Sequence, residues 1–291
     1  MAVERLGYIG LGVMGSRMAR NLARKSGLPV VGYDVDPAKV AALAADGIEP
    51  ASSIREVVER TDVVFLCVPG EPQVREACLG EGGVAEYVRP GQVVVDMTTA
   101  GPGIDREVAE ALSAKGVEFA DAPVAKGVPN AEAGTLAITV GGSEELFERL
   151  QPYLGCMGTE ISHCGPVGTG QVMKLMNNML VLQNVSALAE AMAIATRAGV
   201  ARERVFDILQ HGSGASFAMT RHGTYMTSGD YPDDMFPSRY SLKDITYALD
   251  LASEVGVDAQ GAELAKARLD EVMARGLGEY YCPVMYRLFE D

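Results

Sequence analysis

The sequence predicts an α/β fold, with a doubly wound sheet followed by an all-α domain. Over about the first 165 residues, short apolar runs rich in β-branched residues alternate with segments of helix length. This alternation is typical of βαβ units that build a mostly parallel sheet. A glycine-rich turn follows the first of these runs, and after residue 165 only helical patterns remain.

Seven segments of the N-terminal part are predicted strands. Residues 63–68 and 93–95 are apolar throughout rather than at alternate positions. Such continuous runs fit strands that are buried on both faces of a parallel sheet. The predicted strands are Leu6–Ile9, Pro29–Tyr33, Val63–Val68, Gln92–Asp96, Glu118–Ala120, Leu136–Val140 and Glu160–His163.

The helices expected between these strands have recognisable start signals. A helix over Ser16–Lys25 follows the glycine-rich turn. Pro37 suits the first position of a helix, because the N–H that proline lacks has no intrahelical partner there. Ser53 precedes Glu56 at the spacing of a capping box, which predicts another helix start.

The chain changes character near Gly165, where several glycines and Pro166 form a breaker cluster. Residues 171–198 then run without glycine or proline, and as one helix they would be about 42 Å long. We therefore expect a dinucleotide-binding domain over residues 1–165 and an all-α substrate and oligomerisation domain over 166–291, with a connecting helix at about 170–198. Further helices are predicted at Arg202–Gln210, Leu242–Val255 and Ala259–Arg275.

A helix of that length is not covered by one small domain. We therefore expect a homo-oligomer, a homodimer or a homotetramer, built through the residues after 165.

Composition and charge argue against several classes of protein. With 25 Lys and Arg against 39 Asp and Glu, the net charge is −14, which disfavours nucleic acid and anionic membranes as partners. No run of about 18 apolar residues predicts a membrane span. The five cysteines contain no CxxC pair and the three histidines lack metal-ligand spacing. We therefore expect no metal site and no disulfide framework, and a cytoplasmic protein.

A GxGxxG fingerprint follows the first predicted strand. Its first glycine allows a tight turn, its second lets a pyrophosphate approach the backbone, and its third permits close packing of helix on strand. Asp34 ends the second strand, where its carboxylate can accept hydrogen bonds from the adenosine ribose and repel a 2′-phosphate. The predicted cofactor is therefore NAD in a Rossmann-type domain. The fingerprint consists of Gly10, Leu11, Gly12, Val13, Met14 and Gly15.

Four motifs in this order resemble the β-hydroxyacid dehydrogenase family, and the resemblance covers essentially the whole chain. It implies a long helix between the two domains, a helical domain that completes the active site, and reversible oxidation of a 3-hydroxy acid by a nicotinamide. It also implies that Pro69, Thr98 and Thr99 line the dinucleotide and that Lys243 lies close to nicotinamide and substrate. The motifs are Gly10–Gly15 continued to Met18 and Asn21, Asp121–Gly127 followed by Gly134–Leu136, Gly165–Gly170 followed by Lys174–Asn178, and Lys243–Asp244.

By the same resemblance, Lys174 is the catalytic lysine and Asn178 its partner. Their i, i+4 spacing places both on one face near the start of the long helix. A lysine between two domains can be withdrawn from water, which suits it to acid–base chemistry. Lys174 would take the hydroxyl proton as the hydride leaves, and Asn178 would orient the substrate. From the helical pattern alone a solvated surface lysine is the commoner case, and the four-motif resemblance reverses that preference.

The second motif departs from the family at the loop that holds the substrate. The family usually has Ser-Gly-Gly after Pro-Val, whereas this chain has Ala125, Lys126 and Gly127 after Val124. The backbone N–H groups that would bind a substrate carboxylate remain, but a hydroxyl is lost and an ammonium is gained. Lys126 either engages an anionic group of the substrate or is a surface lysine beside the pocket. The first alternative predicts a substrate that is more polar or doubly anionic compared with 3-hydroxyisobutyrate.

Two other segments carry polar candidates. Asp244 would lie in the first turn of its helix, where the helix dipole favours an acid, so we expect a structural role for it. Residues 211–223 form a predicted glycine-rich loop, in which we expect substrate-facing polar residues without choosing one. The candidates in that loop are Ser213, Ser216, Arg221 and His222.

Together these observations predict an NAD-dependent oxidoreductase that interconverts a small, anionic 3-hydroxy acid and its semialdehyde. A 6-phosphogluconate dehydrogenase shares this fold but is longer and needs phosphate-binding residues that we do not find. An imine reductase is a second alternative, although these enzymes usually lack the lysine present at position 174. A non-catalytic dinucleotide-binding module would have no need of Lys174 and Asn178 together.

Overall fold

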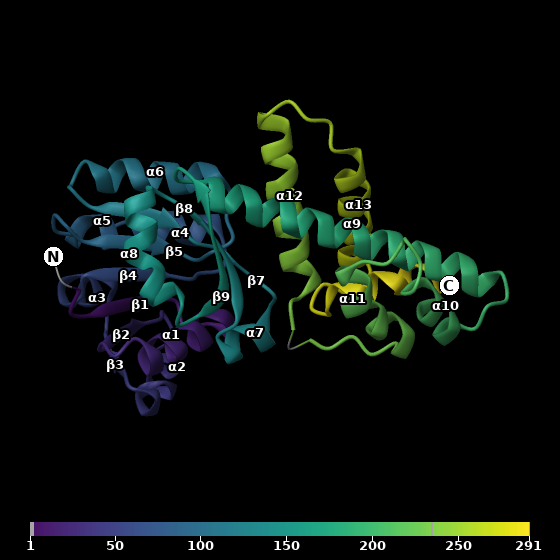
Figure 1. The fold of residues 1–291 in the computed structure, drawn as a ribbon, viewed down its shortest axis with the longest axis horizontal. Coiled ribbons are helices and arrows are strands. Elements are labelled where there is room, and N and C mark those ends of the chain that lie inside the picture. The colour runs from purple at the N-terminus through teal and green to yellow at the C-terminus, as the bar shows by residue number, and fades with distance from the viewer. Residues whose placement is uncertain (1–2, 234, 291) are drawn as a thin grey trace. The chain divides into compact units, whose positions relative to one another are not determined.

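The computed structural model describes residues 3–233 and 235–290. It divides the chain into two compact units, residues 1–174 and residues 175–291. The first unit contains a sheet and its helices, from purple to teal in Figure 1, and the second is helical, from green to yellow.

The N-terminal unit is built on one nine-stranded mixed sheet. The strand order is β3-β2-β1-β4-β5-β6-β8-β7, and β9 pairs with β8. Strands β1 to β6 are parallel, β8 is antiparallel to β6 and β7, and β9 is parallel to β8. The strands are β1 (Leu6–Ile9), β2 (Val30–Tyr33), β3 (Ile48–Pro50), β4 (Val63–Leu66), β5 (Val93–Asp96), β6 (Glu118–Asp121), β7 (Val124–Ala125), β8 (Leu136–Gly141) and β9 (Gly158–Gly165).

All seven predicted strands are confirmed, with ends that differ by no more than two residues. The sequence patterns did not predict β3, which contains a glutamate and a proline and lies at a sheet edge, or β7, which has only two residues. The continuous apolar runs are buried on both faces, as expected. In β4, Val63 and Phe65 belong to one core cluster, whereas Val64 and Leu66 belong to the cluster on the opposite face.

Helices follow the strands of this unit. Pro37 is at the first position of α2, and the side chain of Asp36 caps that helix by accepting from the Ala38 N–H at 3.0 Å. Ser53 caps α3, but the Glu56 carboxylate accepts from the N–H and hydroxyl of Ser52 rather than from Ser53. The helices are α1 (Val13–Lys25), α2 (Pro37–Ala42), η1 (Ala44–Asp46), α3 (Ile54–Arg60), α4 (Glu71–Leu79), α5 (Val84–Tyr87), α6 (Pro102–Ser113), α7 (Val128–Ala133) and α8 (Glu144–Leu154).

The C-terminal unit is formed by helices around two apolar clusters. The long helix α9 begins within the N-terminal unit and continues through the boundary between residues 174 and 175. The helices are α9 (Thr169–Arg197), α10 (Arg202–Leu209), α11 (Phe217–Ser228), α12 (Ser238–Glu254), α13 (Gln260–Ala274) and the 3-10 helix η2 (Cys282–Phe289).

Two predictions for this half were wrong. Residues 217–223 belong to helix α11 rather than to a loop, because Ser216 caps the helix by accepting from the Met219 N–H at 3.0 Å. Helix α12 begins at Ser238, directly after Pro237, and not near Leu242. Lys243 and Asp244 therefore lie in its second turn, beyond the helix start.

Helix α9 is unusually apolar for its length. An 18-residue window within it has a mean hydropathy of 1.4, and 39% of that window is buried. By length and composition this helix could cross a membrane, although a core helix of a soluble protein meets the same criterion.

Candidate active site

The predicted cofactor-binding residues follow four neighbouring strands of one sheet. Strands β2, β1, β4 and β5 are parallel and end in register with one another. Their carboxyl ends therefore meet at one sheet edge, on both sides of the point where the strand order reverses, which is where ligands bind in sheets of this kind. The predicted residues that follow these ends are Gly10, Asp34, Pro69 and Thr98.

The three fingerprint glycines differ in what surrounds them. Gly10 has a φ of +89°, and a Cβ there would lie 2.2 Å from the Cys67 carbonyl oxygen. A Cβ on Gly15 would lie 2.0 Å from the carbonyl oxygen of Gly10. A Cβ on Gly12 would meet no atom within 4 Å. Two glycines thus permit the turn and the helix packing, whereas Gly12 leaves open space next to the backbone.

The start of α1 suits an anionic group. Gly12 is the N-cap residue, no side chain caps the helix, and its first turn contains no acidic residue. Helix N-terminal N–H groups without a side-chain cap bind phosphate through hydrogen bonds and the helix dipole. Val13 is exposed in this turn, while the Leu11 side chain is buried in the core. These residues fit the pyrophosphate of a dinucleotide.

Asp34 is buried beside the fingerprint loop. Its Oδ2 accepts from the Leu11 N–H at 2.7 Å, and its Oδ1 accepts from the Asp36 N–H at 2.9 Å. The Lys39 ammonium lies 3.2 Å from Oδ1. A carboxylate has about four acceptor positions, so one remains for a ribose hydroxyl. Lys39 was not among the predicted site residues. It follows Asp34 by five residues and places a cation next to this carboxylate.

Thr98 connects three segments of the N-terminal unit. Its Oγ1 accepts from the Val68 N–H at 3.1 Å, and its carbonyl accepts from the Gln171 side chain at 2.7 Å. The side chain is buried, whereas Pro69 is exposed and Thr99 is partly buried. Thr98 therefore holds the loops after β4 and β5 together at the start of α9.

Asp121, the first residue of the second motif, anchors the long helix. Its two carboxylate oxygens accept from the Gly168 N–H at 2.7 Å and the Gln171 N–H at 2.8 Å. The buried Gln171 side chain also accepts from the Ala100 N–H at 3.2 Å. Lys174 is partly buried and lies less than one turn after Gln171. The register of this part of α9 is thus fixed from the sheet.

Two further buried acids, Asp96 and Asp105, lie close enough to Asp121 to interact with its charge. Burial raises the pKa of Asp96 to about 6, and burial together with the charge of Asp96 raises the pKa of Asp105 well above its usual range. Within the described residues, no N–H or O–H donates a well-formed hydrogen bond to Asp96 Oδ2 or to the Asp105 carboxyl oxygens. A proton shared between the two carboxyl groups would give Asp96 Oδ2 and one Asp105 oxygen a hydrogen-bond partner. The sequence patterns that we used gave no signal for this pair.

The predicted substrate loop follows β7. Val124 is buried, and Ala125 pairs with Ala137 of β8. Lys126 has a φ of +82°, and its ammonium lies 2.7 Å from the Glu160 carboxylate. Gly127 has a φ of +73° and is the N-cap residue of α7.

Asn21 connects this region to the fingerprint helix. On α1, its side-chain amide donates to the Ala131 carbonyl of α7 at 2.8 Å. The helix that follows the fingerprint is thereby joined to the helix that follows the substrate loop.

In the C-terminal unit, the predicted residues on α9 and α12 meet. The Asn178 side-chain amide donates to Asp244 Oδ2 at 2.6 Å, and the Lys243 ammonium lies 3.1 Å from Asp244 Oδ1. Lys243 also lies 5.1 Å from the centre of the Tyr247 ring. Asp244 is buried. Its structural role is therefore to hold Asn178 and Lys243 in place. The prediction that Asp244 would interact with the dipole at a helix start was wrong, because it lies in the second turn of α12.

The candidates at residues 211–223 are explained mainly by packing. His222 is buried and packs against Tyr281, with 5.3 Å between ring centres. Burial, together with the charge of Arg221, lowers its pKa to about 4, so His222 is neutral at physiological pH. Ser216 caps α11, and Ser213 is exposed.

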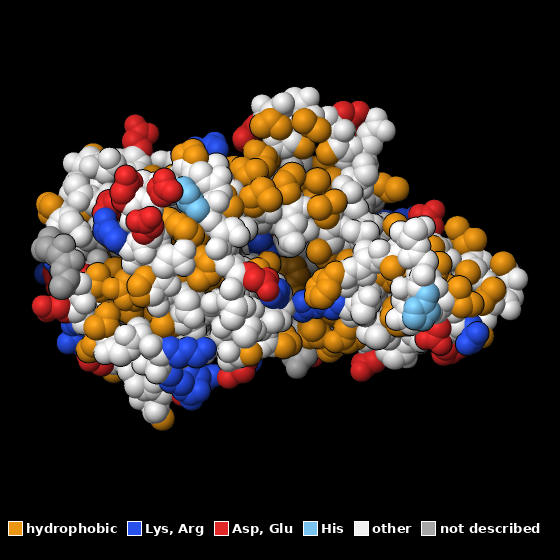
Figure 2. All heavy atoms as spheres, viewed as in Figure 1, with side chains coloured by type: hydrophobic (Ala, Val, Ile, Leu, Met, Phe, Trp, Pro, Cys, Tyr) orange, Lys and Arg blue, Asp and Glu red, His pale blue; other side chains and the backbone are white. Residues whose placement is uncertain are grey.

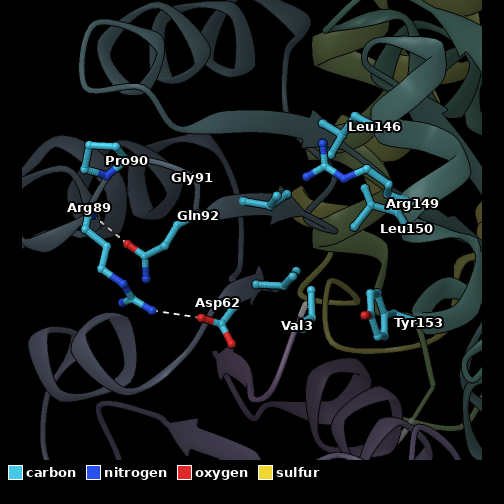
Figure 3. Close-up of a pocket in the computed structure, with 12 residues that line it drawn as sticks. Val3, Asp62, Arg89, Pro90, Gly91, Gln92, Leu146, Arg149, Leu150 and Tyr153 are labelled. Atoms are coloured by element: carbon cyan, nitrogen blue, oxygen red, sulfur yellow. Dashed lines mark hydrogen bonds and ion pairs between the residues drawn. The ribbon is translucent and has the colours of Figure 1, made fainter. Parts of the chain in front are cut away.

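A small pocket lies elsewhere in the N-terminal unit, at the amino ends of β4 and β5 (Figure 3). It encloses about 70 Å³, far less than the several hundred Å³ of typical ligand sites. Arg89 and Asp62 form an ion pair across it at 2.8 Å. The carboxyl ends of the strands, not this pocket, carry the predicted cofactor residues.

Comparison with protein families gives two matches that cover most of the chain. Residues 5–165 match the NAD binding domain of 6-phosphogluconate dehydrogenase. Residues 168–288 match the model described as NAD-binding of NADP-dependent 3-hydroxyisobutyrate dehydrogenase. The N-terminal unit is accordingly an NAD(P)-binding domain.

Individual relatives match over nearly the full length. The chain is 34% identical to 2-(hydroxymethyl)glutarate dehydrogenase of Eubacterium barkeri, over 99% of this chain and 95% of the relative. It is 33% identical to 2-hydroxy-3-oxopropionate reductase of Escherichia coli, over 94% and 92%. Among solved structures, 3-hydroxyisobutyrate dehydrogenase of Mycobacterium tuberculosis with L-serine matches with a TM-score of 0.91, 29% identity and full coverage of both chains.

Proposed function

The chain belongs to the β-hydroxyacid dehydrogenase family, and from this we propose that it is an NAD-dependent dehydrogenase that interconverts a small 3-hydroxy acid and its semialdehyde. The observation that supports it best is that the chain has both a dinucleotide cradle at Gly10–Gly15 and, on α9, Lys174 and Asn178 one turn apart. A non-catalytic binding module would need the cradle but not this pair.

NAD, when bound, accepts the hydride from the carbon that bears the hydroxyl group. In our proposal, Lys174 takes the hydroxyl proton during oxidation and returns it to the carbonyl oxygen during reduction. Asp244 fixes the Asn178 amide through the 2.6 Å hydrogen bond, so the Asn178 side chain has a defined orientation, in which we propose that it contacts the substrate. Asp121 and Gln171 fix the helical turn that precedes Lys174.

The substrate carboxylate is assigned to the loop Val124–Gly127. Its backbone N–H groups supply donors without any net charge, and the loop lacks the family's serine. The names of two relatives support a 3-hydroxy acid, because 2-(hydroxymethyl)glutarate and reduced 2-hydroxy-3-oxopropionate both carry a hydroxymethyl group next to the carbon that bears a carboxylate.

The first test is a substrate panel followed by nicotinamide absorbance. It contains 3-hydroxyisobutyrate, 2-(hydroxymethyl)glutarate and glycerate, each assayed with NAD and with NADP, and the corresponding semialdehydes with the reduced cofactors. We expect turnover of at least one hydroxy acid with NAD. Binding of NAD without turnover of any acid or semialdehyde would support the non-catalytic module instead.

The second test concerns Lys174. Lys174→Ala should lower kcat by at least about 100-fold, the usual scale for loss of a general acid–base group. NAD affinity, measured by calorimetry, should stay within about twofold, because Lys174 lies outside the fingerprint. Lys266→Ala is the matched control, since Lys266 is a helix lysine paired with Asp270 on the surface of the C-terminal unit. Turnover of the Lys174 variant within a few-fold of the native enzyme would assign the proton transfer to another group.

A further inference from the structure

The backbone of Lys126 is in a conformation that lysine rarely adopts. Among the described residues, it is the only non-glycine residue with a positive φ, at +82°. The left-handed region brings Cβ close to the carbonyl oxygen that follows, so a glycine would be more stable there. Strain of this kind is found mainly at functional sites, where it supports a hypothesis of function.

The ion pair with Glu160 does not account for this strain. The Lys126 side chain is 29% exposed and the Glu160 side chain is 63% exposed. Ion pairs at this exposure stabilise a protein little, and by less than a left-handed lysine costs. If the pair were only a surface interaction, a glycine at position 126 would be the more stable choice.

The pair lies near the start of α9 within the same unit. Ala125 on β7 and Glu160 on β9 are both partners of Ala137, on opposite sides of β8. Paired residues share a sheet face, as do residues two apart on one strand, so Glu160 and Thr139 are on the same face of β8. The Thr139 hydroxyl donates to the Gly170 carbonyl in the first turn of α9 at 3.0 Å. The Lys126 ammonium, bound to Glu160, therefore lies near the strand position two residues before Thr139. Thr139 in turn contacts the first turn of the helix that carries Lys174.

We infer that Lys126 is a specificity-determining residue that binds a second anionic group of the substrate, and that Glu160 neutralises its ammonium until that group replaces it. This inference rests on the proposed function and adds the substrate class, a 3-hydroxy acid with a second carboxylate. The first carboxylate is held by the backbone N–H groups of the loop, and the second competes with Glu160 for the ammonium.

The experiment compares a dianion with its neutral counterpart. The probes are 2-(hydroxymethyl)succinate and the same acid with its distal carboxylate converted to the primary amide, which has nearly the same shape. Native enzyme, Lys126→Met and Glu160→Gln are assayed with NAD. Lys126→Met should reduce kcat/KM for the dianion about tenfold more than it reduces kcat/KM for the amide. Glu160→Gln should lower KM for the dianion about threefold and leave the amide unchanged, because the competing carboxylate is removed.

The outcomes separate this inference from the proposed function. Equal effects on both probes, or no effect on either, would overturn the role of Lys126 while turnover itself still supports a hydroxy acid dehydrogenase. If no probe is turned over, the same comparison is made by calorimetric binding to the enzyme with NAD. Tighter binding of the dianion that depends on Lys126 would support the inference, and equal affinity for the two probes would overturn it.

A stability measurement tests the strain independently of catalysis. Lys126→Gly and Lys126→Met both remove the ion pair, but only glycine relieves the left-handed backbone. Urea unfolding should therefore show a higher midpoint for Lys126→Gly than for Lys126→Met. Equal midpoints would mean that the backbone at position 126 is not strained and that strain does not support a binding role for Lys126.

Discussion

The carboxylate of Asp34 shows how one residue can be tuned by neighbours that are not adjacent in sequence. Two backbone N–H groups fix its orientation, and the Lys39 ammonium at 3.2 Å offsets part of its charge. The carboxylate alone would repel a 2′-phosphate. The Lys39 side chain is 45% exposed, so it can also approach such a phosphate. In our proposal, the choice between NAD and NADP is then a balance between these two side chains.

We expect the native enzyme to prefer NAD and Lys39→Met to widen that preference. Lys39→Met removes the only cation paired with Asp34 in the described structure, so kcat/KM with NADP should fall several-fold while that with NAD changes little. Asp34→Ala combined with Val35→Arg should act in the opposite direction, because it removes the repulsion and supplies a cation. The ratio of kcat/KM values for the two cofactors is the measurement. Equal or better use of NADP by the native enzyme would contradict the NAD assignment.

At the scale of the secondary-structure element, α9 depends on the sheet for its starting point. Gly168, with a φ of +92°, and Gly165, with a φ of +120°, bring the chain into the helix. Asp121 then accepts from the backbone of Gly168 and Gln171. The anchor is a buried carboxylate whose pKa is raised by burial, while the hydrogen bonds from those backbone N–H groups act to lower it.

Asp121→Asn should weaken this anchor. The two carboxylate oxygens of Asp121 each accept a hydrogen bond from a backbone N–H group. In the asparagine variant, an amide NH2 group, which is also a donor, would replace one of these acceptors. We expect a loss of about 1–3 kcal/mol in the free energy of unfolding, the usual scale for a buried group that loses its partner. We also expect a lower kcat with NAD affinity retained, because Lys174 follows within a turn.

The matched control for this variant is Asp270→Asn. Asp270 forms an exposed pair with Lys266 four residues earlier, so its loss should change stability by less than about 0.5 kcal/mol. Urea unfolding, kcat and calorimetric NAD affinity are compared for the two variants. If Asp121→Asn resembled the control in all three, Asp121 would not be the anchor of α9.

For the whole molecule, the buried acids Asp96 and Asp105 make stability depend on pH. A raised pKa in the folded state means that the native protein binds more protons than the unfolded chain. For Asp96, this favourable contribution is therefore fully present below an unfolded-state pKa of about 3.9 and is lost as the pH rises through about 6. The pKa of Asp105 is also raised, so its contribution is lost in the same direction as the pH rises. This is the opposite of His222, whose lowered pKa destabilises the fold as the pH falls from about 6.5 toward about 4.

Asp105→Asn should remove most of the loss in the free energy of unfolding that ionisation of the two buried acids causes at neutral and alkaline pH. The amide can donate to Asp96 Oδ2 without needing a proton from solvent, so the free energy of unfolding at pH 8 should rise by about 1–3 kcal/mol relative to the native protein. At pH 4 the difference should be small or reversed. Asp250→Asn, at an exposed position of α12, is the control and should show no such dependence. Parallel stability curves for native protein and Asp105→Asn across this range would argue against a shared proton.

The surface of the C-terminal unit supports our proposal of a homo-oligomer. Several large apolar side chains are exposed on its helices, including Leu180 and Ile194 on α9 and Leu264 on α13. Figure 2 shows hydrophobic side chains over the visible face of this unit. In our proposal, these exposed apolar side chains contribute to the contact between subunits.

Light scattering at micromolar concentration should give a mass of at least twice the 30.8 kDa chain. Leu180→Glu together with Ile194→Glu should reduce that mass, because charges placed within an apolar interface oppose association. Val35→Glu, at an exposed apolar site in the N-terminal unit, is the control and should leave the mass unchanged. A monomer in the native protein would count against the proposal.

Local sequence determined most of the fold. The apolar runs of β4 and β5, the fingerprint glycines and the unbroken stretch before residue 198 each specify an element through contacts within a few residues, so their patterns could be interpreted directly. The errors fell where local signals were weak. The edge strand β3 contains a proline, β7 has two residues, and Ser216 began a helix within a stretch that glycines made resemble a loop.

The sequence also singled out Lys174, Asn178, Asp34 and Lys126 as candidates, because each belongs to a motif or departs from one. It could not supply their partners. Lys39 reaches Asp34, Glu160 reaches Lys126 across β8, Asp244 holds Asn178, and Asp105 meets Asp96 only once the chain has folded. Each of these four partners lies on a different element from the residue that it contacts, and the charge and protonation of each group depend on burial and on such neighbours. Motif spacing therefore determined which residues were candidates, and tertiary contacts decided their electrostatic state.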